Sequence, residues 1–112
     1  MKKLKLMTIV GTRPEIIKMS AIIKKADKYL DHVLVHTGQN YDYNLNEVFF
    51  KDFGLREPDY YLGVVGKNIG ETMGNVISKA YDLMVKIKPD AVIVLGDTNS
   101  CLSIIAAKRL KI

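Results

Sequence analysis

Residues 4–30 read LKLMTIVGTRPEIIKMSAIIKKADKYL, and their hydrophobic period changes at Gly11. The apolar run Leu4–Val10 is too short for a helix and is typical of a strand buried on both faces. After Pro14, apolar residues recur three and four positions apart, which is the stripe of an amphipathic helix. Pro14 suits the first helical turn, because its missing N–H would have no partner there. This stretch therefore predicts a strand, a tight turn and a helix.

The same alternation continues along the rest of the chain. Further strands are expected over residues 32–36, 60–62 and 91–95. Further helices are expected over residues 45–49, 69–87 and 102–110. Alternating strands and helices with short connections indicate right-handed βαβ units. We therefore expect an α/β, Rossmann-like fold, with a parallel sheet and helices on both of its faces.

Composition and charge are those of an ordinary globular protein. The 112 residues allow one domain at most, and 48% hydrophobic with 26% charged residues excludes a disordered or low-complexity chain. The 17 basic and 12 acidic side chains give a net charge of +5, which favours anionic partners. The lysines are scattered over expected helix ends and exposed faces, so we expect no nucleic-acid partner.

Cysteine use and hydropathy favour a cytoplasmic protein. Cys101 is the single cysteine, which excludes an intrachain disulfide and a cysteine zinc cluster and indicates a reducing compartment. The first apolar run is short and lacks the cleavage site of a signal peptide. No apolar stretch approaches the roughly 20 residues that span a bilayer, so we expect no membrane partner.

Polar loops follow three of the expected strands, and ligands of open parallel sheets bind beyond the carboxyl ends of the strands. The first loop, GTRPE at residues 11–15, places Arg13 at a helix N-terminus, where unpaired N–H groups and a guanidinium can bind phosphate or carboxylate. It is neither a Walker A loop nor a GxGxxG fingerprint. A helix begun by proline with a surface arginine explains the same residues equally well.

The second and third loops carry groups that can bind a sugar. In TGQNYDY, residues 37–43, amide and phenol groups can bind a sugar or a base, although turn residues with surface tyrosines are a slightly better explanation. In GDTNS, residues 96–100, Asp97 is placed to act as a base, an acid or a ligand for hydroxyl groups. An ordinary helix N-cap is an equally natural role for Asp97.

Both histidines of the chain belong to one expected strand. His32 and His36 are four residues apart, so strand alternation places them on the same face. A third metal ligand at suitable spacing is missing from the sequence around them. Packing at the strand edge therefore explains them better than a metal site.

Together, the three loops resemble those of the non-hydrolysing UDP-N-acetylglucosamine 2-epimerases. IVGTRPEIIKM, HTGQNYD and PDAVIVLGDTNS are similar, in order and spacing, to the N-terminal third of these enzymes, from about Leu4 to Arg109. NYDYNLNEVFF and GDTNSCL most resemble the branch that acts on UDP-linked 2-acetamido-2,6-dideoxy sugars. The resemblance implies two Rossmann-like domains of the glycosyltransferase-B type with the UDP-sugar between them. Residues 1–112 would then be an incomplete N-terminal domain, and the C-terminal nucleotide-binding domain would be absent from this chain.

The resemblance also implies a reaction. UDP-N-acetylglucosamine, or the 2,6-dideoxy equivalent, would be inverted at C2 by elimination and re-addition of UDP, without a redox cofactor or metal, in the synthesis of surface polysaccharide precursors. Asp97 is implied as an acid–base residue. The implied substrate-binding residues are Arg13, Lys18, Gln39 and Thr98. Other catalytic residues would lie beyond Ile112, so the chain would be inactive alone, and the complete enzyme would be a homodimer.

Two alternatives stay open on the sequence. One is a glycosyltransferase of the same two-domain architecture, because a fold does not fix a function. The other is a non-catalytic truncated remnant, marginally folded or self-associating through an exposed sheet edge.

Overall fold

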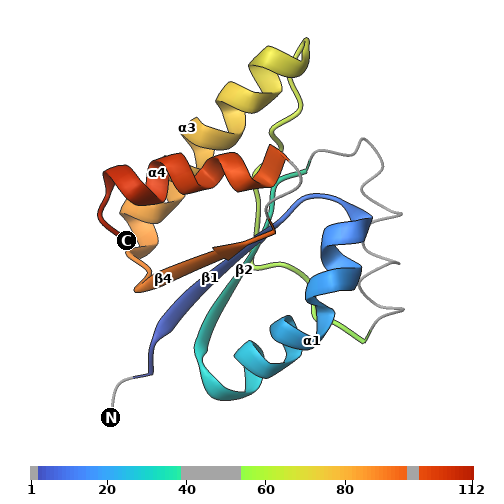
Figure 1. The fold of residues 1–112 in the computed structure, drawn as a ribbon, viewed down its shortest axis with the longest axis vertical. Helices are drawn as coiled ribbons and strands as arrows, with labels where there is room; N and C mark the ends of the chain where they lie inside the picture. Colours follow the sequence, from blue (N-terminus) through green and yellow to red (C-terminus); the bar gives the residue numbers. More distant parts are fainter. Residues whose placement is uncertain (1–2, 39–53, 96–98) are drawn as a thin grey trace.

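The computed structural model describes residues 3–38, 54–95 and 99–112, which form a four-stranded parallel sheet with helices on both faces (Figure 1). The strands are β1 (Lys5–Val10), β2 (Asp31–His36), β3 (Tyr60–Tyr61) and β4 (Ala91–Val94). The helices are α1 (Arg13–Tyr29), α3 (Ile69–Ile87) and α4 (Ser103–Arg109), and a 3-10 turn, η1 (Asn99–Leu102), leads into α4. The expected α/β, Rossmann-like class is therefore confirmed, while the helix expected over residues 45–49 lies outside the described residues.

The strand order is β3-β2-β1-β4, so β1 lies between β2 and β4. β1 pairs with β2 along its whole length, from Lys5 opposite Asp31 to Val10 opposite His36, and with β4 on its other side. Because all three pairings are parallel, the strands end at one edge of the sheet. We call this edge the carboxyl edge, and the loops that carry the expected site residues start there.

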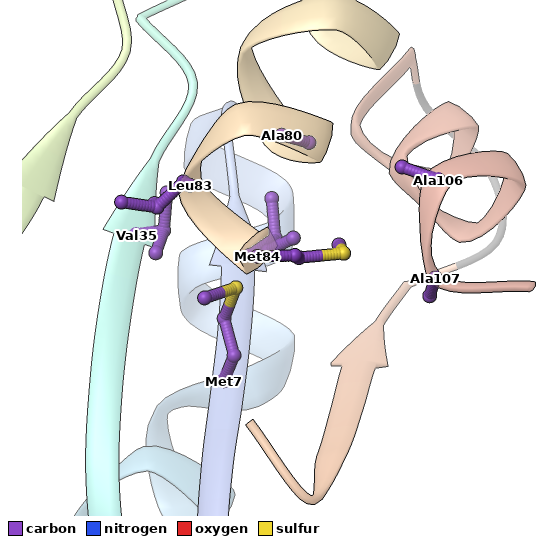
Figure 2. Close-up of a cluster of buried hydrophobic side chains, with 8 residues drawn as sticks. Met7, Val35, Ala80, Leu83, Met84, Ala106 and Ala107 are labelled. Atoms are coloured by element: carbon purple, nitrogen blue, oxygen red, sulfur yellow. The ribbon is translucent and has the colours of Figure 1, made fainter. Parts of the chain in front are cut away.

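The sheet separates two hydrophobic clusters, as the alternation of side chains along a strand requires. On one face, Met7 and Val35 pack against Leu83 and Met84 of α3. Ala106 and Ala107 bring α4 against the same cluster, where their small side chains allow a close approach (Figure 2). On the opposite face, the strands are covered by the apolar stripe of α1. That cluster contains Val10, Ile16, Met19, Ile23, Leu34 and Leu55.

The two ends of α3 are capped in different ways. At the N-terminus, Asn68 is the N-cap, and its side-chain oxygen accepts a hydrogen bond of 2.8 Å from the backbone N–H of Glu71. At the other end, Lys88 has a left-handed conformation with φ of 56°, and its N–H donates to the carbonyl of Met84. Glycine is the usual residue at such a position, since a Cβ disfavours the left-handed region. Pro89 follows and prevents the helix from continuing.

Lys88→Gly is therefore expected to stabilise the chain, by about 0.5 kcal/mol in the free energy of unfolding, because it relieves left-handed strain at a small cost in entropy. Lys86→Gly, inside the last turn of α3, is the matched control and should destabilise by about 1 kcal/mol. Urea unfolding followed by circular dichroism measures both changes. Equal destabilisation by the two substitutions would contradict the strain at Lys88.

No helix within residues 3–38, 54–95 and 99–112 is long and apolar enough to cross a membrane.

Candidate functional site

The turn between β1 and α1 is organised by one buried carboxylate. Glu15 is fully buried, and its Oε2 accepts hydrogen bonds from the backbone N–H groups of Gly11 and Thr12, each at 2.7 Å. The Thr12 hydroxyl donates to the same oxygen at 3.1 Å. Thr12 is the N-cap of α1 and Glu15 lies three residues later, so this is a capping box with an additional donor. The positive end of the helix dipole further favours the negative charge of Glu15.

Glu15 restricts how this turn could bind an anion. The N–H groups of Gly11 and Thr12, which precede the first residue of α1, both bind Glu15. The Thr12-x-x-Glu15 spacing was the signal that could have predicted this cap. Any anion at this turn therefore has to be bound by other groups.

The end of β2 carries a buried imidazole. The His36 ring is stacked on Tyr61, with ring centroids 4.9 Å apart and an angle of 11° between the planes. Its Nδ1 accepts a hydrogen bond of 2.9 Å from the backbone N–H of Gly38. Burial lowers the pKa of His36 from 6.5 to about 4, so the ring is neutral at pH 7. Strand-edge packing was expected for His36, and the structure adds a specific hydrogen bond and an aromatic partner.

The other histidine lies in an array of hydroxyl, imidazole and carboxylate. His32 Nε2 is 2.6 Å from the Thr8 hydroxyl, and His32 Nδ1 is 2.7 Å from Asp27 of α1. The order of groups resembles a nucleophilic triad, but Thr8 is fully buried and out of reach of a substrate. The array therefore holds β1, β2 and α1 together and is not an active site.

Arg56 extends this array. Its Nε donates to Asp27 at 2.9 Å, and its terminal nitrogen is 3.0 Å from Asp59. Partial burial alone would lower the pKa of Arg56, but hydrogen bonds to Asp59 and Asp27 raise it above its ordinary value. Among the described side chains, no group of three or more His, Cys, Asp or Glu is arranged to hold a metal ion.

The structure places some of the expected site residues. Arg13 is the first residue of α1, and Lys18 lies further along the same helix with an exposed side chain. Three others, Gln39, Asp97 and Thr98, lie outside the described residues. Their loops nevertheless start at the carboxyl edge, because β2 and β4 flank β1 and run parallel to it. The starts of the three loops are therefore neighbours.

The likeness to known proteins agrees with this arrangement. A family model described as UDP-N-acetylglucosamine 2-epimerase matches residues 23–112. The chain belongs to this family. The resemblance drawn from the three loops is thereby confirmed at the level of the family.

Solved epimerases share the fold of this chain. The structure of a UDP-N-acetylglucosamine 2-epimerase from Rickettsia bellii is 59% identical, with a TM-score of 0.89, over 98% of this chain and 29% of that one. The Methanocaldococcus jannaschii enzyme, solved in complex with UDP-GlcNAc and UDP, is 40% identical with a TM-score of 0.89, over 97% of this chain and 31% of that one.

A curated relative has a different sugar in its name. The UDP-2,3-diacetamido-2,3-dideoxy-D-glucuronate 2-epimerase of Pseudomonas aeruginosa is 39% identical over 97% of this chain and 32% of its own length. The family therefore includes epimerases of more than one UDP-linked sugar, and the 2,6-dideoxy branch stays a prediction. This chain spans about 30% of the length of these relatives.

Proposed function

We propose that this chain forms part of a UDP-N-acetylglucosamine 2-epimerase that produces UDP-N-acetylmannosamine. The likeness to the Rickettsia bellii epimerase, at 59% identity over 98% of this chain, is the observation that carries the proposal. The neighbouring starts of three polar loops at the carboxyl edge support it, since ligands of parallel sheets bind at this edge. The resemblance further favours a cytoplasmic homodimer that needs no redox cofactor.

The proposed chemistry needs a base and a cationic site. In the first step the C2 proton passes to a base and the C1–O bond breaks, which gives a 2-acetamidoglycal and UDP. In the second step C2 is protonated from the opposite face and UDP adds again at C1. The C2 proton is weakly acidic, so the base has to be positioned, and the departing pyrophosphate has to be stabilised.

We assign residues of this chain to proton transfer, to stabilisation of the pyrophosphate and to binding of the sugar. Asp97 acts as an acid–base residue in these proton transfers. Arg13 and Lys18, both on α1, supply positive charge for the pyrophosphate. Gln39 and Thr98 hydrogen-bond the sugar. The family resemblance implies that most of the uridine site and the remaining catalytic groups lie in the part of the relatives that this chain does not cover.

A chimeric enzyme tests the proposal. This chain replaces the matching 29% of the Rickettsia bellii epimerase, and conversion of UDP-N-acetylglucosamine to UDP-N-acetylmannosamine is followed by NMR. We expect the chimera to turn over, and Asp97→Asn to lower its kcat by about 100-fold to 10,000-fold, the usual contribution of general acid–base catalysis.

The control is Asp31→Asn, an exposed carboxylate at the first residue of β2 and therefore at the opposite edge of the sheet. It should leave kcat unchanged. Full turnover by the Asp97→Asn chimera would contradict the role of Asp97. A folded chimera that transfers the sugar to an acceptor without inverting C2 would instead favour the glycosyltransferase alternative.

A further inference from the structure

The backbone that leaves β2 is fixed by hydrogen bonds on both sides. The N–H of Thr37 donates to the carbonyl of Val10 in β1 at 2.8 Å. On the other side, the N–H of Leu62 donates to the carbonyl of His36 at 2.8 Å, and the N–H of Val64 donates to the carbonyl of Thr37 at 3.0 Å. Residues 36 and 37 are therefore held between β1 and the segment that follows β3.

That segment is itself anchored to α3. The ammonium group of Lys79 donates to the carbonyls of Leu62 and Gly63, at 3.0 Å and 2.9 Å. The side-chain amide of Asn75 donates to the carbonyl of Val64 at 3.0 Å. Because these donors belong to a well-packed helix, the partners of His36 and Thr37 have little freedom to move.

Gly38 is the next residue, and its N–H is held by a side chain. The acceptor is His36 Nδ1, at 2.9 Å, so this nitrogen carries no proton and the neutral ring has its proton on Nε2. Gly38 has φ of +78°, and a Cβ there would lie 2.8 Å from the Tyr61 ring that stacks on His36. Gly38, Tyr61 and His36 are therefore packed so closely that a side chain at position 38 would clash with the tyrosine ring.

We propose that His36 is a positioning residue for nucleotide-sugar binding, and that it acts by accepting the Gly38 N–H at Nδ1. This bond sets the direction in which the chain leaves β2 at the carboxyl edge, next to the β1–α1 turn. The inference rests on the proposed function, because it assumes that the nucleotide sugar binds at this edge. His36 is buried and acts through the backbone, so contact with the substrate is not part of its role.

Two substitutions separate the acceptor from the aromatic ring. His36→Asn places an amide oxygen where Nδ1 lies and keeps the acceptor but loses the ring. His36→Phe keeps a ring that can stack on Tyr61 but removes the acceptor. A role in packing alone predicts that His36→Phe is the milder change, whereas a positioning role predicts the reverse.

The first measurement uses the chimera with the Rickettsia bellii enzyme. We expect His36→Phe to raise KM for UDP-N-acetylglucosamine about tenfold, the effect of one lost hydrogen bond, and to change kcat much less. His36→Asn should keep KM within about threefold of the unsubstituted chimera. A KM that stays unchanged in His36→Phe, or that rises equally in both variants, would overturn the positioning role.

The second measurement uses the 112-residue chain and needs no activity. Hydrogen exchange of the Gly38 amide, followed by NMR, should be slow in the unsubstituted chain and in His36→Asn, and at least about tenfold faster in His36→Phe. Equal exchange in all three chains would overturn the positioning role. An inactive unsubstituted chimera with the expected exchange pattern would instead overturn the proposed function, and with it the link to the nucleotide sugar.

Discussion

Glu15→Ala is expected to destabilise the chain by about 3 kcal/mol in the free energy of unfolding. The substitution removes the acceptor of two backbone N–H groups and one hydroxyl, and Gly11, one of the donors, is buried. A buried donor left without a partner costs about 1–3 kcal/mol, and a lost helix cap adds about 1 kcal/mol. Urea unfolding followed by circular dichroism at pH 7 measures the change.

Glu71→Ala is the matched control, because Glu71 lies three residues after the N-cap of α3, as Glu15 does in α1. Glu71 is exposed, and its carboxylate accepts a longer hydrogen bond, 3.3 Å, from the N–H of Lys67. We expect a loss below about 1 kcal/mol there. Glu15→Gln keeps an acceptor and removes the charge, so its loss should lie between the two. Similar losses for Glu15→Ala and Glu71→Ala would show that burial of the cap is not decisive.

The architecture could be predicted from the sequence because it follows from the spacing of hydrophobic residues within each short segment of the chain. Met7 and Ile9 face α3 and α4, while Val10 faces α1, so the predominantly apolar run correctly indicated a strand covered on both faces. The left-handed Lys88 could not be predicted, because glycine is the residue that usually marks this helix end.

The site was less predictable because its contacts join distant parts of the chain. His36 meets Tyr61 only through the pairing of β2 with β3, and His32 meets Thr8 only through the register of β1 with β2. Neither pairing leaves a motif in the sequence. Glu15, by contrast, depends on a spacing of three residues and could have been recognised.

Stability is expected to fall by about 3 kcal/mol as the pH is lowered from 6.5 to about 4, because of His36. The pKa of His36 is lowered to about 4 in the folded chain by burial, and the ordinary value of 6.5 applies when the chain unfolds. Above pH 6.5 the ring is neutral in both the folded and the unfolded chain, so burial of His36 causes no loss of stability there. Below pH 6.5 the unfolded chain binds the proton and is favoured, until the folded chain also binds it near pH 4.

Protonation would also have a local effect, since Nδ1 would then carry a hydrogen facing the N–H of Gly38. Urea unfolding at several pH values between 7 and 4 measures the loss of stability. His36→Asn, which cannot titrate in this range, should remove most of it. If the unsubstituted chain and His36→Asn lose the same stability between pH 7 and pH 4, a group other than His36 causes the pH dependence.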